Sequence, residues 1–204
     1  LDLVNKLSSN NKANEYYLTE IIALANKAKM RCVVHLTDEA EVMGINDKAQ
    51  LATAEMYFQH RLRNKFLNEG VTMIDPQTVY FSADIKIGKD VIIHPNVIFG
   101  EGVELEDEVE IFPFSHIAGA KVCEGASIGP FARIRPKSKI GKKSKVGNFV
   151  EVKAAEFGEE VKASHLSYIG DAKVGDNTNI GAGTIFCNYD GYSKHFSKIG
   201  KDVS

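Results

Sequence analysis

The stretch from Ile85 to Leu105, IKIGKDVIIHPNVIFGEGVEL, repeats a pattern of six residues, and the pattern continues as far as Phe186. In each unit an aliphatic or aromatic residue follows a small or β-branched residue by two positions, as Ile93 follows Val91. A spacing of two places both side chains on one face of a strand. The larger residue of each unit is therefore expected to point inward: Ile87, Ile93, Phe99, Leu105, Ile111, Ile117, Val122, Ile128, Ile134, Ile140, Val146, Val152, Phe157, Ala163, Ile169, Val174, Ile180 and Phe186.

The residues between these pairs are of a different kind, for example GKD at 88–90 and GEG at 100–102. Strict alternation would bury Lys89 and Glu101, so their charges indicate that the chain bends there. Each unit is then a short strand and a corner, which is typical of a parallel β-helix. Three units would make one turn of a triangular helix, giving about six turns spaced at roughly 4.8 Å. A sandwich of hairpins is disfavoured, because hairpin strands do not keep a six-residue phase over this length.

The composition narrows the class of protein. The chain has 204 residues, 44% of them hydrophobic, and a net charge of −2, so nothing suggests a nucleic-acid partner. It has no apolar run that could span a bilayer and no signal peptide, which predicts no membrane partner. Cys32, Cys123 and Cys187 are scattered, as expected of free thiols in the cytoplasm. The first residue is not Met and the last residues open a new repeat, so we expect a fragment of a longer protein.

Residues 1–72 lack the six-residue pattern. A helix is expected at Glu15–Lys29 and a strand at Met30–Leu36. Asp47 is a candidate N-cap for a second helix that runs to Asn68 and is closed by Gly70. Its predicted apolar stripe is Leu51, Ala54, Phe58, Leu62 and Phe66.

Three segments follow from these expectations: 1–46 as the end of an α/β domain, 47–72 as a linker helix, and 73–204 as the β-helix. The repeat breaks after Phe186, and CNYDGYSKHFSK at 187–198 is predicted to be a loop that projects from the helix. Loops on a rigid scaffold often carry function, although a neutral surface insertion is an alternative.

The repeat also predicts which side chains come together. Arg135 and Lys153 each follow an inward aliphatic residue and are eighteen residues apart, so they should stack on successive coils. Like charges so placed repel unless an anion lies between them, and an arginine fork beside a lysine suits a phosphate. The alternative is a solvated basic edge, since further lysines lie nearby.

His165 lies in a corner just before Tyr168, and we expect both to meet Arg135 and Lys153 at one edge. Histidine suits proton transfer near neutral pH, whereas an isolated exposed histidine is usually only a surface residue. No histidine pair has the spacing of a metal cluster, so no zinc is expected in the coils.

Several motifs point to a known family. The runs IGPFARIRPKSKIG at 128–141, HLSYIGD at 165–171 and NIGAGTIFCNYDG at 179–191 closely resemble the bacterial GlmU family. These are bifunctional glucosamine-1-phosphate N-acetyltransferases and N-acetylglucosamine-1-phosphate uridyltransferases. The resemblance covers essentially the whole chain and implies a mainly β fold, a left-handed parallel β-helix of hexapeptide repeats, preceded by the α/β end of a nucleotidyltransferase domain.

The resemblance also implies roles for individual residues. His165 would be the general base that takes a proton from the amine of glucosamine 1-phosphate as it attacks the thioester of acetyl-CoA. Other matched positions are sugar-phosphate ligands (Arg135, Lys153, Tyr168 and Asn179), acetyl-CoA contacts (Ala182, Asn188 and Tyr189), a residue that could orient the site (Glu151) and a loop lysine near it (Lys194).

The resemblance implies a second reaction as well. Asn46 matches an asparagine that helps to bind Mg²⁺ and UDP-N-acetylglucosamine, and UTP would be the nucleotide substrate. The nucleotide-binding loop of that domain is missing here, so the chain alone is not expected to transfer UMP. The family makes UDP-N-acetylglucosamine for peptidoglycan and lipopolysaccharide, and its acetyltransferase site lies between neighbouring subunits of a homotrimer.

Two other functions remain possible from the sequence. A nucleotidyltransferase could use the β-helix only for oligomerisation or regulation, and it would not need a histidine beside stacked cations. A non-enzymatic scaffold would show an uninterrupted repeat and no projecting loop.

Overall fold

The structure is a computed structural model that describes residues 2–204, in two compact units, one ending at Ile45 and one spanning Asn46–Ser204. The first unit contains η1 (Val4–Lys6), α1 (Glu20–Lys27) and η2 (Glu39–Glu41), so the first expected helix is present but shorter. The strand predicted at Met30–Leu36 is wrong, because these residues have no regular structure. Residues 2–45 contain no other strand, so this β-branched run lacks the partner that a strand requires.

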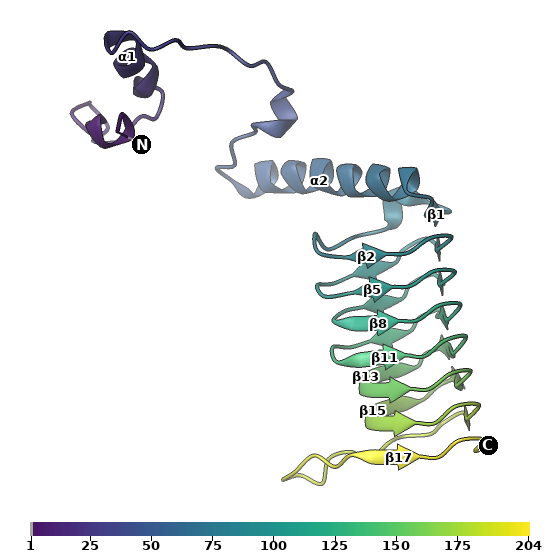
Figure 1. The fold of residues 1–204 in the computed structure, drawn as a ribbon. Coiled ribbons are helices and arrows are strands. Elements are labelled where there is room, and N and C mark those ends of the chain that lie inside the picture. The colour runs from purple at the N-terminus through teal and green to yellow at the C-terminus, as the bar shows by residue number, and fades with distance from the viewer. Residues whose placement is uncertain (1) are drawn as a thin grey trace. The chain divides into compact units, whose positions relative to one another are not determined.

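The second unit is a parallel β-helix with three faces (Figure 1). The first face is a seven-stranded sheet: β1 (Thr72–Met73), β3 (Ile92–Ile93), β6 (Glu110–Ile111), β9 (Ser127–Ile128), β12 (Lys145–Asn148), β14 (Lys162–His165) and β16 (Asn179–Ile180). The second face holds β4 (Ile98–Phe99), β7 (His116–Ile117), β10 (Arg133–Ile134) and the first parts of β13 (Glu151–Phe157) and β15 (Tyr168–Val174). The third face holds β2 (Lys86–Ile87), β5 (Glu104–Leu105), β8 (Ala120–Val122), β11 (Ser138–Ile140), the last parts of β13 and β15, and β17 (Ser197–Ile199).

The coils wind in the left-handed sense, as the family resemblance implied (Figure 1). This departs from the right-handed crossovers of most parallel sheets. Many corners place a residue in the left-handed backbone region, including Phe114 (φ 59°), Phe131 (φ 53°) and Phe149 (φ 55°). That region is unfavourable for bulky side chains in isolation, so the packed coils must hold these corners in place.

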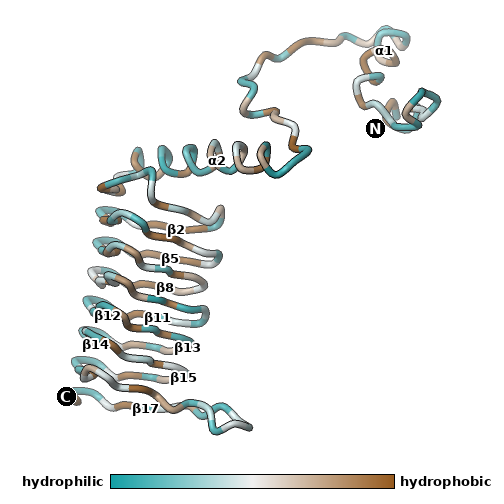
Figure 2. The backbone as a smooth tube through the Cα atoms, turned by 180° about the vertical axis from the view of Figure 1, so that it is seen from behind, coloured by the Kyte–Doolittle hydropathy of each residue, from teal (hydrophilic) through white to brown (hydrophobic). Residues whose placement is uncertain are grey.

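The core confirms the six-residue prediction. All the residues expected to point inward are buried except Ile87, which is partly buried at the start of the helix. The smaller partners two positions earlier are buried as well: Val91, Val97, Val103, Val109, Ser115, Ala126, Ala132, Ser138, Ser144 and Val150. Hydrophobic and hydrophilic segments alternate along each coil (Figure 2). Each buried aliphatic side chain contributes about 1.5–3 kcal/mol to stability, so the prism is held mainly by this inner column.

Helix α2 (Lys48–Asn68) has the predicted limits. The Asp47 side chain accepts a hydrogen bond from the Gln50 amide at 2.8 Å, and Gly70 follows the helix with φ 96°. The predicted stripe is only partly right, because Leu51 and Phe58 are exposed. The helix buries its last turns alone, through Gln59, Leu62, Arg63 and Phe66.

These last turns of α2 cap the first coil. The Gln59 amide donates to the Phe81 carbonyl at 2.7 Å and accepts from the Phe81 amide at 2.9 Å, as a neighbouring strand would. Arg63 Nε donates to the Val79 carbonyl at 3.0 Å. The Phe66 ring covers Phe81 with centroids 5.0 Å apart. The end of a solenoid exposes unpaired backbone groups and core side chains. This helix forms hydrogen bonds with the backbone groups and covers the core side chains.

The predicted loop lies in the last coil, at the corner between the second and third faces, directly before β17. Val174 pairs with Ile199, twenty-five residues later, whereas the coils before it advance by seventeen or eighteen after a first step of twenty from β1 to β3. Within the loop, Tyr189 and Lys194 form an antiparallel bridge. Asp190 accepts hydrogen bonds from the amides of Tyr192 and Ser193, and those bonds together with His195 lower its pKa to about 2. The projecting segment is therefore an ordered turn.

Candidate functional site

Three positions stack at the edge between the second and third faces. Ile134 pairs with Val152, and Val152 pairs with Ile169 on the next coil. The residues that follow them, Arg135, Lys153 and Gly170, therefore occupy equivalent positions on successive coils. The predicted stacking of Arg135 and Lys153 is confirmed, and we call this the cationic edge.

Each cation of this edge is paired with a carboxylate. Arg135 Nη1 donates to Glu151 Oε1 at 2.9 Å, and Lys153 Nζ lies 3.2 Å from Asp171 Oδ2. The side chains of Lys153 and Asp171 are 20% and 18% exposed, so this pair is better shielded from water than a surface ion pair. The anions predicted to relieve the repulsion between stacked cations are thus partly supplied by the protein.

The projecting loop folds back onto the cationic edge. Asn188 Nδ2 donates to Asp171 Oδ2 at 2.5 Å and to the Tyr168 hydroxyl at 3.3 Å. A Cβ on Gly170 would lie 2.4 Å from the Tyr168 hydroxyl and 2.6 Å from Asn188 Nδ2. A larger residue at 170 would therefore displace the Tyr168 and Asn188 side chains, which connect the loop to the coil.

Lys194 brings a third cation from the same loop. Its contact with Lys153 lowers the pKa of Lys194, because the positive charge of Lys153 disfavours a second ammonium group beside it. The pKa of Lys153 is raised through its contacts with Lys194 and then Asp171. Burial pushes the pKa of Asp171 upward, but the hydrogen bonds from Lys153 and Asn188 outweigh burial, so this pKa is lowered. The cationic edge therefore carries more positive than negative groups and suits an anion.

The prediction that His165 shares this edge is wrong. His165 ends β14 and pairs in register with Asn148 of β12, at the corner between the first and second faces. Its Nδ1 lies 2.9 Å from Asn148 Oδ1. The cations follow the strand of the second face, whereas His165 precedes it, and Tyr168 lies on the strand between them. The error arose because the repeat in the sequence predicts which residues align on successive coils. It does not predict which corner of a coil each residue occupies.

Aromatic side chains mark the edge on which His165 lies. The rings of Phe114 and Phe131 stack with centroids 4.9 Å apart, and those of Phe131 and Phe149 at 5.3 Å. Leu166 continues the column, and all four side chains are about half exposed. We call this column the aromatic edge. A groove of about 330 Å³ runs between its corners, lined by Pro130, Phe131, Phe149 and His165 among others.

The other predicted residues lie around these two edges or apart from them. Asn179 is exposed on β16, and Ala182 is exposed in the corner that follows it. Tyr189 is exposed in the loop beside Asn188. Asn46 is exposed at the start of the second unit, where its backbone N–H donates a hydrogen bond to Gln50 Oε1 at 2.6 Å.

The surroundings of Asn46 do not fit Mg²⁺ by themselves. Among residues 2–204, no group of three or more histidine, cysteine, aspartate or glutamate side chains could hold a metal ion. One amide oxygen is too few for a cation that prefers six oxygen ligands. No step of a reaction is therefore assigned to a metal in this chain.

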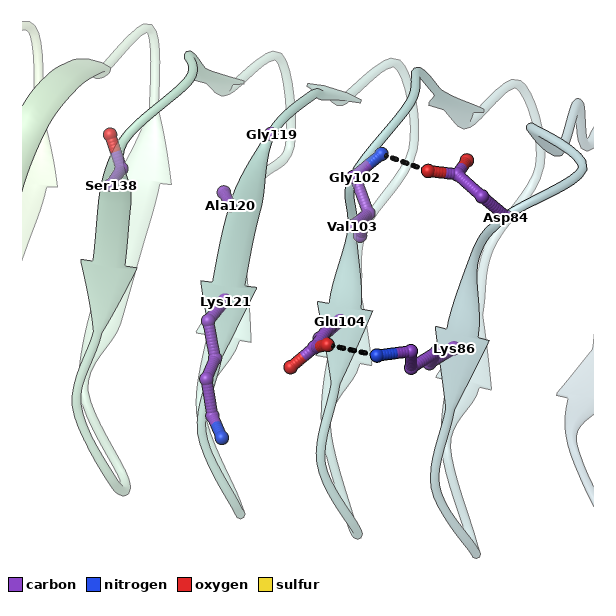
Figure 3. A pocket seen from close by; sticks show the side chains of 9 residues that line it. All are labelled: Asp84, Lys86, Gly102, Val103, Glu104, Gly119, Ala120, Lys121 and Ser138. Atoms are coloured by element: carbon purple, nitrogen blue, oxygen red, sulfur yellow. Dashed lines mark hydrogen bonds and ion pairs between the residues drawn. The ribbon is translucent and has the colours of Figure 1, made fainter.

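A second hollow lies on the third face, on the coils between Asp84 and Ser138, and Figure 3 shows its lining. Lys86 pairs with Glu104 at 2.5 Å, and Asp84 accepts the Gly102 amide at 2.7 Å. These partners already satisfy one another, and none of the predicted site residues lines this hollow.

In residues 2–204, no helix combines the length and the apolar character needed to cross a membrane.

Sequence reasoning missed Asp171, which contacts two of the predicted residues. The available signal was the shortened corner: only Gly170 and Asp171 separate Ile169 from Ala172, whereas three residues follow Ile134 before Ser138. Gly170 is in register with Lys153. A carboxylate at such a corner is a candidate partner for a cation one coil away.

Comparison with known proteins confirms the resemblance found in the sequence. No family model matches the chain. Curated proteins named bifunctional protein GlmU do: that of Wolbachia pipientis is 47% identical over 201 residues, that of Bradyrhizobium sp. 54% over 201, and that of Rhodopseudomonas palustris (strain BisA53) 56% over 200. Each alignment covers 98% of this chain but only 44–47% of the relative, so the chain spans about half the length of these relatives.

The solved structures found by the same comparison are more distant. PerB from Caulobacter crescentus, solved with CoA and GDP-perosamine, is 13% identical with a TM-score of 0.36 and covers 64% of this chain and 60% of PerB. The UDP-N-acetylglucosamine acyltransferase from Campylobacter jejuni is 13% identical with a TM-score of 0.22 and covers 53% of this chain and 65% of that one. Likenesses this weak say nothing about the substrate of this chain.

Proposed function

Because this chain is similar to GlmU proteins along almost all its length, we propose that it is part of a bifunctional enzyme of that kind. Its reaction is transfer of an acetyl group from acetyl-CoA to the amine of glucosamine 1-phosphate. Residues 1–46 are the end of the uridyltransferase domain, 47–72 the linker helix and 73–204 the acetyltransferase domain. The observation that carries this proposal is the gathering of Arg135, Lys153 and Lys194 at one edge.

The sugar phosphate lies across the second face, with its phosphate at the cationic edge. Arg135 and Lys153 each keep donors beyond those used by Glu151 and Asp171, since a guanidinium has five and an ammonium three. Lys194 lies close enough to Lys153 to share the same anion. Tyr168 lies between the two edges and contacts the sugar, and Asn179 binds it from the next coil.

His165 is the general base at the other end of the substrate. An ammonium is not a nucleophile, so the amine must lose a proton as it attacks the thioester carbonyl. The Asn148 oxygen beside Nδ1 favours a proton on that nitrogen, which leaves Nε2 free to accept. The C–N bond forms and the C–S bond breaks, and the proton that His165 takes from the amine is passed to the departing sulfur, so that CoA leaves as the thiol.

The projecting loop and the corner after β16 hold acetyl-CoA. Asn188 and Tyr189 contact it from the loop, and Ala182 contacts it from the corner. Asn188 is buried against the cationic edge while Tyr189 is exposed, so the loop has a fixed end and a free face for the cofactor. Glu151 orients Arg135 through their hydrogen bond.

The active assembly is a homotrimer in the cytoplasm. An exposed column of stacked rings is unusual on a monomer and marks a contact surface. Phe114, Phe131, Phe149 and Leu166 form such a column beside His165, so a neighbouring copy that covers it would also exclude water from the base. Partial enclosure of the site between copies accounts for its open form in one chain.

Uridylyl transfer from UTP, giving UDP-N-acetylglucosamine for cell-wall and lipopolysaccharide synthesis, belongs to the full-length protein. Mg²⁺ serves that reaction, with Asn46 as one contributor. The alternative, a nucleotidyltransferase with a purely structural β-helix, gives no reason for three cations and an anchored loop at one edge.

The proposal is tested by following release of the CoA thiol from acetyl-CoA in a full-length GlmU protein that contains this chain. Glucosamine 1-phosphate is expected to support release. Glucosamine is expected to be much poorer because it lacks the phosphate, and N-acetylglucosamine 1-phosphate should support none because its amine is already acylated. Equal rates with glucosamine and its phosphate would contradict the assignment of the cationic edge.

A further inference from the structure

Asp171 occupies a special place in the coil that carries His165 and Tyr168. It is the second residue of a two-residue corner between Ile169 and Ala172, and its φ is 48°. Ala154 holds the equivalent place one coil earlier, also with positive φ, and has no polar side chain. The contacts of Asp171 are therefore not a general requirement of the corner.

One oxygen of Asp171 connects three successive coils. Its Oδ2 accepts from Lys153 Nζ at 3.2 Å on the coil before and from Asn188 Nδ2 at 2.5 Å on the coil after. Asn188 in turn donates to the Tyr168 hydroxyl at 3.3 Å on the coil of Asp171 itself. The proposed phosphate ligand, sugar ligand and cofactor loop thus meet at a single carboxylate.

The charge of Asp171 matters as well as its shape. Lys153 and Lys194 are close enough to compete for a proton, so without a nearby anion the two ammonium groups would push each other apart. Asp171 lies beside both and offsets that repulsion before any substrate arrives. The neutral partner Asn188 also holds the first residues of the loop that carries Lys194.

We propose that Asp171 is a positioning residue of the acetyltransferase site, which holds Lys153 toward the phosphate and fastens the loop 187–196 through Asn188. This inference rests on the proposed function for its effect on substrate, but its effect on the loop does not. Asp171 reaches the substrate only through Lys153 and Asn188, so it is not a catalytic residue.

The matched comparison is Asp171→Ala against Asp176→Ala. Asp176 lies five residues later at the next corner, pairs with Lys201 and accepts the Glu159 amide at 3.0 Å. Each variant removes a corner aspartate of the same coil that is paired with a lysine. Only Asp171 lies at the cationic edge. Asp171→Asn keeps the shape of the side chain and removes its charge, so it serves if the alanine variant fails to fold.

The first measurement is hydrogen exchange of residues 187–196 without substrate. Asp171→Ala is expected to speed exchange in this loop about tenfold, and Asp171→Asn less, while Asp176→Ala leaves it unchanged. Unchanged exchange in both Asp171 variants, or an equal change in Asp176→Ala, would overturn the inference.

The second measurement is the kinetics of acetyl transfer in the full-length protein. Asp171→Ala is expected to raise KM for glucosamine 1-phosphate about tenfold while kcat changes less than about threefold, since chemistry at His165 is intact. A fall in kcat alone would contradict a positioning role. If the unaltered protein releases no CoA thiol, the proposed function fails, yet the exchange result still decides whether Asp171 holds the loop.

Discussion

The two edges that border the second face are built in opposite ways. The aromatic edge repeats one kind of residue over successive coils, Phe114, Phe131, Phe149 and then Leu166, and its rings stack on one another. The cationic edge repeats nothing: Arg135, Lys153 and Gly170 follow in turn, and each makes different contacts. A regular column stabilises the coils and offers a uniform surface, whereas an irregular one presents a particular set of charges, as a binding site for one ligand would require.

The corner lengths show the same contrast. Corners of the aromatic edge keep three residues, for example Gly147–Phe149 and Ser164–Leu166. On the cationic edge the corner is two residues at Lys153, two at Gly170, and a long loop in the last coil. Two of these departures bring a charged group onto Lys153: Asp171 lies in the two-residue corner after Ile169, and Lys194 lies in the long loop. A two-residue corner alone is not a guide to a site, because Ala118 and Gly119 form one that carries no charge.

Removing His165 should have the largest effect, because it takes away the proposed base at the aromatic edge. In a full-length protein, His165→Ala is expected to lower the rate of CoA release with glucosamine 1-phosphate by about two to four orders of magnitude. Uridylyl transfer, assayed in the same preparation, should persist. Loss of both activities would indicate misfolding, and normal acetyl transfer would exclude His165 from the chemistry.

Removing a cation from the other edge should have a smaller effect, concentrated in substrate binding. Lys153→Ala is expected to raise KM for glucosamine 1-phosphate by about ten- to a hundredfold, the range of one charge-assisted hydrogen bond. Lys142→Ala is the control, because Lys142 pairs with Glu124 at 2.9 Å at the corner between the third and first faces, which is neither of the two edges. Equal changes in the two variants would remove the distinction between the cationic edge and an ordinary charged surface.

The sequence predicted the repetitive part of this molecule well, because burial alone determines it. Every inner residue from Ile93 to Phe186 is buried, since an inward charge would have no partner in the prism. The N-cap at Asp47 was also predictable, because capping depends on a few neighbouring residues. In contrast, the β-branched run at Met30–Leu36 satisfies strand propensity but finds no partner strand in residues 2–45.

The candidate site was predicted only in part. The spacing of Arg135 and Lys153 gave their register, which a fixed repeat determines. It did not give the separation of His165 from them, which depends on which corner each residue occupies. Asp171 was missed because its role arises from a shortened corner and a loop that returns from seventeen residues further on. Gln59 was missed on α2 because a polar side chain replaces backbone pairing at the coil end.

The aromatic edge should also decide assembly. Phe131 lies between Phe114 and Phe149, so Phe131→Ser removes two ring contacts and exposes polar groups on the column. Burying a phenylalanine contributes about 1.5–3 kcal/mol, so the concentration at which the proposed trimer dissociates is expected to rise by at least about tenfold. Sedimentation velocity over a dilution series measures this. Tyr57→Ser on the exposed side of α2 is the control, and an equal shift there, or none in Phe131→Ser, would show that copies meet elsewhere.

The smallest expected effect is the pH dependence of phosphate binding at the cationic edge. Contact with Lys153 lowers the pKa of Lys194, and an anion between them favours the charged form of both, so the pKa of Lys194 should rise when phosphate binds. Binding is then strongest below the pKa of the free group and weakens as the pH rises through the pKa of the bound one. Each unit of difference between the two values allows at most about a tenfold change in affinity.

Titration with glucosamine 1-phosphate between about pH 7.5 and 9.5 measures this slope, since the phosphate is already a dianion there. Lys194→Arg, which stays charged over the whole range, should bind with little dependence on pH. A slope in Lys194→Arg as steep as in the unaltered protein would mean that another group titrates, and would separate Lys194 from the anion site. A slope confined to the lysine form would instead show that the loop, and not the regular coils, gives the cationic edge its third charge.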